Sequence, residues 1–435
     1  MTEARPFVHS SIAKDVIAAL AIAAAILLVY AGTAGYGLFS DDFSWLAGAR
    51  SFDAASLVQI DGRAHFYRPV IELYFPAVLS VCGPAASCYH WFSIALHFFT
   101  SLSVGALAAS LSRSRLLGVF AGLLFATQPA GVEAVVWVSA VSELLATLSF
   151  VLTVWLFWRA LNSGRRLHFC YAGCTFTACL LAHESGVMLL PILGLLTVTL
   201  PTSPHGESVL GRLRAHLVVF VCLALILAAY GAIAYIINVR NYVVVEGQYA
   251  LGTHIAGNVS RALGTFVVAR RDALGSVIVV LFFVWACTLA GPRARFYALW
   301  TIAALLPFAG FRGGLSSRYL YLSAAGCAGL IAESLWWARD RIAAMTVPAT
   351  AALWGILSVG LLVRFGAFAS KNVHAWESAS APYRAYYAQI HDAYPSPERG
   401  ALLEIPAPPH GVASLNIPAF VRWEYGDNTL RVAVK

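Results

Sequence analysis

Apolar runs of about 20 residues recur along this chain, and short loops that contain arginine separate them. A run of this length can cross a bilayer as a helix, and cytoplasmic loops of membrane proteins carry an excess of basic residues. Charged residues make up 11% of the chain, against roughly 25% in soluble domains. We therefore expect an all-α polytopic membrane protein. Its net charge of +8 is spread over loops, which indicates topology and not a nucleic-acid partner.

Loops with at least two arginines divide the chain into spans of alternating direction. We expect about 11 spans, at residues 16–30, 89–111, 116–128, 142–160, 167–182, 186–200, 216–237, 276–290, 296–309, 319–338 and 343–366. Five successive arginine loops and the N-terminus are then cytoplasmic, and the C-terminus is extracytoplasmic. The run 16–30 is interpreted as an uncleaved first span and not as a signal peptide. Two more apolar segments, 67–83 and 254–271, are expected to be outer-face surface helices or, for the first, a re-entrant helix.

Composition changes after the last expected span, where proline, tyrosine and charged residues become frequent. We therefore predict a transmembrane domain over residues 1–369, with a first outer loop at 34–88, and a small α+β extracytoplasmic unit over 370–435. Residues 374–394 have the pattern of an amphipathic helix, and 420–434 that of a hairpin with Asp427-Asn428 in its turn. Cys82 and Cys88 flank a short segment of the outer loop, where either a disulfide or two free thiols would fit.

Ionisable side chains are costly at the edge of a bilayer, so the few present are candidates for function. On this map they gather on the outer side: Asp41, Asp42, Glu133, Glu143, His183, Glu184 and Arg318. We expect them to line one cleft. Structural roles are the alternatives: an N-cap for the aspartates, solvated interfacial positions for Glu133 and Glu143, an inter-helix pair for His183 and Glu184, and an external loop charge for Arg318.

Six segments of the chain occur in the order and spacing of a known family. They are SDDFSW, YRPVIELYF, YHWFSIALHFF, GLLFATQPAGVEAVVWVSAVSELLATLSF, LLAHESGVMLLP and SSRYLYLSAAG. In these segments the chain resembles the GT-C superfamily of polytopic glycosyltransferases that use polyprenyl-phosphate sugars. Within that superfamily it is most similar to the transmembrane and tetratricopeptide-repeat O-mannosyltransferases and their bacterial relatives, without the repeats.

The resemblance implies a GT-C-like bundle with a catalytic acid at Asp41 or Asp42, a supporting acid at Glu133 and a lipid-phosphate contact at Arg318. Beyond what the resemblance implies, we assign Tyr67, Arg68 and Glu143 to the supporting and acceptor side, and His183 and Tyr319 to the donor-phosphate side. The chain departs from the family at Gln128–Gly131, where two histidines are absent, and at Ser317, which replaces a glutamate. Protein O-mannosylation therefore does not carry over.

These observations lead us to expect a hexosyl- or pentosyltransferase of the bacterial inner membrane that serves cell-envelope glycosylation. The lipid-linked sugar is the donor, and the acceptor is a glycan, a lipid or a protein. Asp41 is favoured as the general base of an inverting displacement, with Asp42 orienting the acceptor or the loop. No cofactor is required on this view, although a divalent metal on Asp41, Asp42 and Glu133 is an alternative. The rival functions are a transporter or flippase of lipid-linked sugars and a catalytically inactive GT-C-like scaffold.

Overall fold

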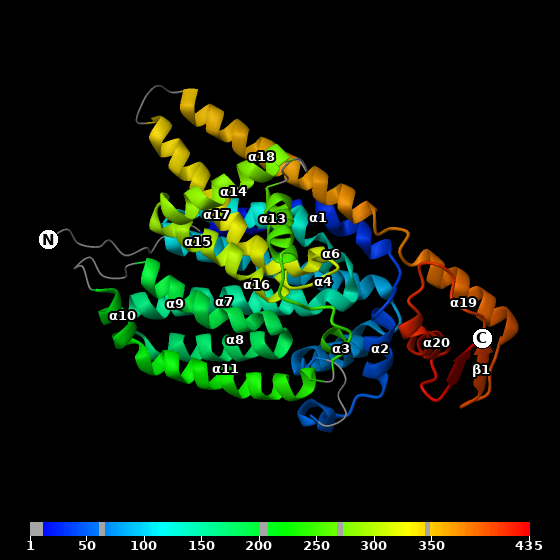
Figure 1. Ribbon diagram of the computed structural model, residues 1–435. Helices are drawn as coiled ribbons and strands as arrows, with labels where there is room; N and C mark the ends of the chain where they lie inside the picture. Colours follow the sequence, from blue (N-terminus) through cyan, green and yellow to red (C-terminus); the bar gives the residue numbers. More distant parts are fainter. Residues whose placement is uncertain (1–11, 61–65, 201–207, 240, 268–272, 344–348) are drawn as a thin grey trace.

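The computed structural model describes residues 12–60, 66–200, 208–239, 241–267, 273–343 and 349–435. Its main body is a bundle of helices, with a small C-terminal unit at one end (Figure 1). The bundle contains α1 (Ile12–Tyr30), α4 (Ala86–Ser112), α5 (Arg115–Ala126), α7 (Val141–Ser163), α8 (Arg166–Ala182), α9 (Leu189–Thr199), α11 (Leu217–Asn238), α14 (Ala273–Thr288), α15 (Pro292–Ala303), α17 (Tyr321–Ala343) and α18 (Ala349–His374). Each predicted span corresponds to one of these helices.

Length and composition separate these helices into two groups. Five helical stretches in the described part of the chain are long and apolar enough to cross a bilayer: Ile12–Gly35, Ala86–Ser112, Val138–Ser163, Leu217–Asn238 and Ala352–His374. A sixth results if α5 and the following Pro129–Val136, which are bent by 45°, count as one span. The other bundle helices are shorter or less apolar. The predicted all-α polytopic membrane protein is confirmed.

The arginine loops meet at one end of the bundle, which we call the Arg113 end. Arg113, Arg293 and Arg341 line a cavity of about 580 Å³ there, together with Leu200 and Asn162. Two further loops reach the same end: Arg165 shares a neighbouring hollow with Asn162, and Arg212 donates to the carbonyl of Val198, 3.1 Å away. The five loops predicted to lie together therefore do so.

Short helices occupy the opposite end, which we call the Asp41 end. They are α2 (Asp42–Arg50), α3 (Pro69–Cys82), α6 (Val132–Val136), α13 (His254–Phe266), α16 (Leu306–Ala309) and the 3-10 turns η4 (Val138–Ala140), η5 (Glu184–Met188) and η6 (Ser317–Leu320). On α13 the buried residues Asn258, Ala262 and Phe266 share one face, as its amphipathic pattern predicts. The Asn258 amide donates to the carbonyls of Ala309 and Phe311 and so holds the loop that leads to η6. Part of the predicted range of this helix, 268–271, lies outside the described residues.

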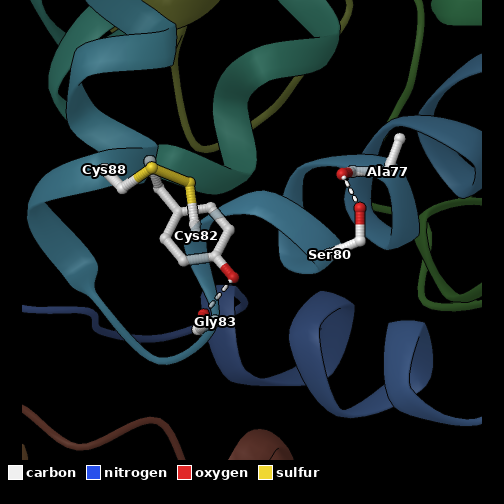
Figure 2. The surroundings of a disulfide bond; sticks show 6 residues. Ala77, Ser80, Cys82, Gly83 and Cys88 are labelled. Carbon is white, nitrogen blue, oxygen red and sulfur yellow. Dashed lines mark hydrogen bonds between the residues drawn. A yellow bond between two sulfur atoms is a disulfide. The ribbon is translucent and has the colours of Figure 1, made fainter.

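A disulfide joins Cys82, at the end of α3, to Cys88, near the start of α4 (Figure 2). The two Cα atoms are 5.5 Å apart. Gly83 has a φ of 52°, a conformation that favours glycine, and its carbonyl accepts a hydrogen bond of 2.7 Å from the Tyr89 hydroxyl. Of the two alternatives left open by the sequence, the structure contains the disulfide, which fixes the turn between α3 and α4.

The C-terminal unit consists of α19 (Ala381–Ala393), β1 (Leu402–Ile405), η7 (Ser414–Asn416), α20 (Ile417–Tyr425) and β2 (Arg431–Val434). The two strands pair in parallel, Leu402 opposite Arg431. The predicted hairpin over 420–434 is therefore wrong. Ile417, Phe420 and Val421 are buried at the spacing of a helix and not of a strand, and Gly426 ends that helix in a left-handed conformation, with φ 68°.

The C-terminal unit packs on α2, so segments far apart in the sequence lie side by side at the Asp41 end (Figure 1). The rings of Phe43 and Phe420 are 4.8 Å apart. The Arg50 guanidinium lies over the Trp423 ring at 4.0 Å and donates to the Trp423 carbonyl. Asn428 donates to the carbonyl of Ala47 over 3.0 Å. These contacts place the unit against the loop that holds the aspartate pair.

Candidate active site

Asp41 and Asp42 lie at the N-terminus of α2, directly after Ser40, which has a φ of 54°. Asp41 is the N-cap residue, but its side chain makes no capping bond to the start of its own helix. Capping by Asp41 therefore does not explain the pair. The two carboxylates point to different partners and lie in different surroundings.

Asp42 is fully buried, with an exposed fraction of 0%. Its Oδ1 accepts hydrogen bonds from the backbone N–H and the hydroxyl of Ser139 over 2.8 and 2.6 Å, and its Oδ2 accepts one from the Phe39 N–H over 3.0 Å. Burial raises the pKa of Asp42 to about 7, although the Ser139 and Phe39 donors oppose that rise. With both oxygens engaged, Asp42 ties the segment before α2 to η4.

Asp41 is half-buried and has a different partner. Its Oδ1 accepts a hydrogen bond of 2.6 Å from the Asn416 side-chain amide, which lies in the C-terminal unit. The amide oxygen of Asn416 in turn accepts a hydrogen bond of 2.8 Å from the Ser44 hydroxyl. Asp41 Oδ2 accepts no hydrogen bond from the described residues.

Glu133 and Arg318 form an ion pair between α6 and η6, with Nη1 and Oε1 2.7 Å apart. The carboxylate also accepts hydrogen bonds from the hydroxyls of Ser316 and Ser317 and from the Arg318 backbone N–H. Arg318 Nη2 donates to the Tyr319 hydroxyl over 3.0 Å. Phe308 and Phe311 stack on the Tyr319 ring. Glu133 thus orients an arginine whose side chain keeps 26% of its surface exposed.

A second charged group joins α7, η5 and the start of α3. Arg68 donates from Nε and Nη2 to the Glu184 carboxylate over 2.8–3.1 Å. His183 is buried, with Nε2 3.1 Å from Glu143 Oε1 and Nδ1 3.1 Å from the Ser185 hydroxyl. Among the described residues Nδ1 has a hydrogen-bond partner, whereas Nε2 approaches Glu143 without a hydrogen bond, and both Glu143 oxygens are left without one. This geometry places His183 beside Glu143, and the phosphate contact of His183 stays a prediction.

Trp137 lies between the aspartate loop and the arginine. Its ring stacks on Phe39 at 6.0 Å, and the Arg318 guanidinium lies 4.8 Å from its centroid. The His183 ring lies 5.8 Å from that of Phe308, which stacks on Tyr319 beside Arg318, so the two charged groups are neighbours. The structure therefore brings the predicted acids and bases together at the Asp41 end.

Tyr67 is half-buried, and its hydroxyl donates to the carbonyl of Leu57 over 3.0 Å. Asp41, Asp42 and Glu133 do not converge as metal ligands, since Asp42 is bound to Ser139 and Glu133 to Arg318. In the part of the chain that the structure describes, no group of three or more histidine, cysteine, aspartate or glutamate side chains is arranged to hold a metal ion.

Sequence reasoning missed Ser139, Ser316 and Asn416. Ser139 lies shortly before Glu143 in the segment AVVWVSAVSELLATLSF, and Ser316 and Ser317 directly precede Arg318. A hydroxyl this close to a predicted charged residue was a usable signal. Asn416 has no comparable signal, because it lies 375 residues from its partner in a segment of unremarkable composition.

The sequence matches no protein-family model and no curated protein. Its fold is similar to solved structures. The oligosaccharyltransferase of Archaeoglobus fulgidus in its apo form is 13% identical with a TM-score of 0.54; the match covers 97% of this chain and 64% of that one. ArnT from Cupriavidus metallidurans in the apo state is 13% identical with a TM-score of 0.57, covering 98% and 86%.

A second ArnT structure, bound to undecaprenyl phosphate, matches with a TM-score of 0.56 and 13% identity over 97% of this chain and 86% of that one. The oligosaccharyltransferase also matches when tethered to an acceptor peptide, with a TM-score of 0.55 and 11% identity over 97% and 64%. This chain thus spans about 64% of the oligosaccharyltransferase's length. At such identities the likeness concerns the fold: the chain has the GT-C fold that its motifs predict.

Proposed function

We propose that this protein is a membrane glycosyltransferase that moves a sugar from a polyprenyl-phosphate donor to an acceptor hydroxyl. The proposal rests on two groups near Trp137. Asp41 has one carboxylate oxygen without a hydrogen bond from the described residues, and its loop contacts Trp137 through Phe39. Arg318 is oriented by Glu133, partly exposed, and lies over the Trp137 ring. The shared fold with ArnT, which has been solved with undecaprenyl phosphate bound, supports a lipid-phosphate donor.

The reaction needs a proton acceptor and a stabiliser for the leaving group. The acceptor oxygen bonds to the anomeric carbon while Asp41 Oδ2 takes the hydroxyl proton. The bond from the anomeric carbon to the phosphate oxygen breaks, and the lipid phosphate leaves with that electron pair. Arg318, with Tyr319 beside it, stabilises the developing charge. A single displacement inverts the anomeric centre.

The remaining charged residues have supporting roles in this proposal. Asp42 fixes the loop that carries Asp41, and Glu133 holds Arg318 in place. Arg68, Glu143 and Tyr67 serve the acceptor side. Glu184 lies against Arg68, and His183 lies against Glu143. The acceptor is a glycan, a lipid or a protein that reaches the Asp41 end, and the chemistry needs no metal.

We place the Asp41 end outside the cytoplasm of a bacterial inner membrane. The five arginine loops lie at the opposite end, as expected for cytoplasmic loops. The Cys82–Cys88 disulfide lies at the Asp41 end, and disulfides persist in oxidising compartments. The N-terminus is then cytoplasmic and the C-terminal unit extracytoplasmic, and residues 1–369 and 370–435 form the two proposed domains.

The test uses purified protein in nanodiscs with a panel of polyprenyl-phosphate sugars and a panel of acceptors, and it measures release of polyprenyl phosphate. We expect Asp41→Asn to lower kcat about 100- to 10,000-fold, because general-base catalysis contributes that much. Asp53→Asn is the matched control: Asp53 lies in the same loop but caps η2 (Ala54–Val58) through the Ala55 N–H. Its turnover should equal that of the wild type.

Two results would contradict the proposal. Equal turnover in Asp41→Asn and wild type would remove Asp41 from the chemistry. If no donor releases phosphate but a fluorescent lipid-linked sugar crosses between leaflets, the protein is a transporter. The anomeric configuration of the product, measured by NMR, tests inversion separately.

A further inference from the structure

Asn416 and Asp41 are N-cap residues whose side chains bond to each other and not to their own helices. Each is the N-cap residue of a nine-residue helix, α20 and α2, and neither side chain caps its own helix. Asparagine and aspartate at N-caps ordinarily accept hydrogen bonds from the first turn of their own helix. Here the Asn416 amide donates to Asp41 Oδ1 over 2.6 Å instead. Departures from local rules of this kind are concentrated at functional sites.

The orientation of the Asn416 amide is fixed at both ends. Its nitrogen donates to Asp41, and its oxygen accepts from the Ser44 hydroxyl over 2.8 Å. An amide that turned over would place its oxygen against the carboxylate, which can only accept. Asn416 is 6% exposed, so water competes little for these bonds. The contact therefore holds Asp41 Oδ1 in one place.

From this geometry we infer that Asn416 is a positioning residue for Asp41, so that the C-terminal unit completes the active site. The inference rests on the proposed function, in which Asp41 is the general base. By occupying Oδ1, the amide leaves Oδ2 as the oxygen that meets the acceptor hydroxyl.

The chain offers a control for the simpler view that Asn416 only fastens the C-terminal unit. Asn428 also donates from that unit to α2, but to the backbone carbonyl of Ala47. It is a side-chain amide of the same type on the same interface and does not touch Asp41. Loss of docking would affect Asn416→Ala and Asn428→Ala alike, whereas loss of positioning would affect the first alone.

The experiment measures kcat, donor KM and the pH–rate profile for wild type, Asp41→Asn, Asn416→Ala, Asn416→Asp and Asn428→Ala in nanodiscs. We expect Asn416→Ala to lower kcat about tenfold or more, the effect of one hydrogen bond to a charged group, with donor KM unchanged. Asn428→Ala should stay within about twofold of wild type, because its contact does not reach the base.

The pH–rate profile of Asn416→Asp distinguishes positioning of Asp41 from a purely structural role, which would leave the profile unchanged. It has nearly the same shape but places a second carboxylate against Asp41. Two adjacent carboxylates keep a proton between them to higher pH than one does, so the acid limb of its pH–rate profile should move to higher pH.

Equal kcat values for Asn416→Ala and Asn428→Ala, in an active wild type that Asp41→Asn inactivates, would overturn the inference and leave the proposed function intact. An acid limb of Asn416→Asp that coincides with that of wild type would also overturn it. A wild type that turns over no donor overturns the proposed function, and the inference with it.

Discussion

Replacing Arg318 with lysine keeps the positive charge and removes the shape that the structure uses. The guanidinium bonds to Glu133 and to the Ser316 hydroxyl through Nη1, and to the Tyr319 hydroxyl through Nη2. A lysine ammonium is a compact charge on a flexible stem and cannot reproduce this fork. We expect it to keep the bond to Glu133 and to lose the other two.

The expected cost follows from those two bonds. At about 0.5–1.5 kcal/mol each, their loss removes about 1–3 kcal/mol. These two bonds hold the guanidinium in place. If Arg318 stabilises the departing phosphate, a charge that is no longer held there should lose transition-state stabilisation of about the same size, and kcat/KM should fall about 5- to 150-fold, since 1.4 kcal/mol is a factor of ten. The measurement is the rate of polyprenyl-phosphate release at subsaturating donor.

Arg293→Lys is the matched control, because it changes the same side chain in another ion pair. Arg293 Nε lies 2.8 Å from Glu333 Oε1 at the Arg113 end, the far end of α17 from Arg318. Its kcat/KM should not change. An unchanged kcat/KM in Arg318→Lys, or an equal loss in both variants, would refute the role given to Arg318.

Two further predictions concern stability. The pKa of Asp42 is raised to about 7, so its contribution to stability is present in full below its unfolded pKa and is lost as pH rises through about 7. The melting temperature in detergent should therefore fall between pH 5 and 8, and less so in Asp42→Asn; equal slopes would refute this. Cys82→Ser opens a seven-residue loop and should cost about 2 kcal/mol, seen as a lower melting temperature; reducing agent should lower wild type equally.

The helix bundle was predictable because its signal is carried by long stretches of sequence. Apolar runs and arginine loops report membrane depth and side directly, and each predicted span is a helix here. The C-terminal unit was harder. Its segment 420–434 contains a short helix and a strand, and over so few residues the periods of 2 and 3.6 are easily confused.

The sequence predicted that these charged residues would lie together, but not which partners they would have. The rule that charged groups near a bilayer are functional brought Asp41, Glu133 and Arg318 to attention. Sequence could not tell which aspartate is buried, because that depends on the Ser139 hydroxyl lying against Asp42. Nor could it show that His183 lies against Glu143. These facts depend on contacts between distant segments, which no local pattern encodes.

The contact between Asp41 and Asn416 also sets an order of events during biosynthesis. The two residues are separated by 375 positions, so the ribosome makes Asp41 long before its partner. Throughout that interval the aspartate loop is already inserted but lacks the amide that holds its carboxylate. On the proposed function, a chain that is still being translated, or one whose synthesis stops before Asn416, should therefore turn over lipid-linked sugars more slowly than the finished protein, as expected for Asn416→Ala.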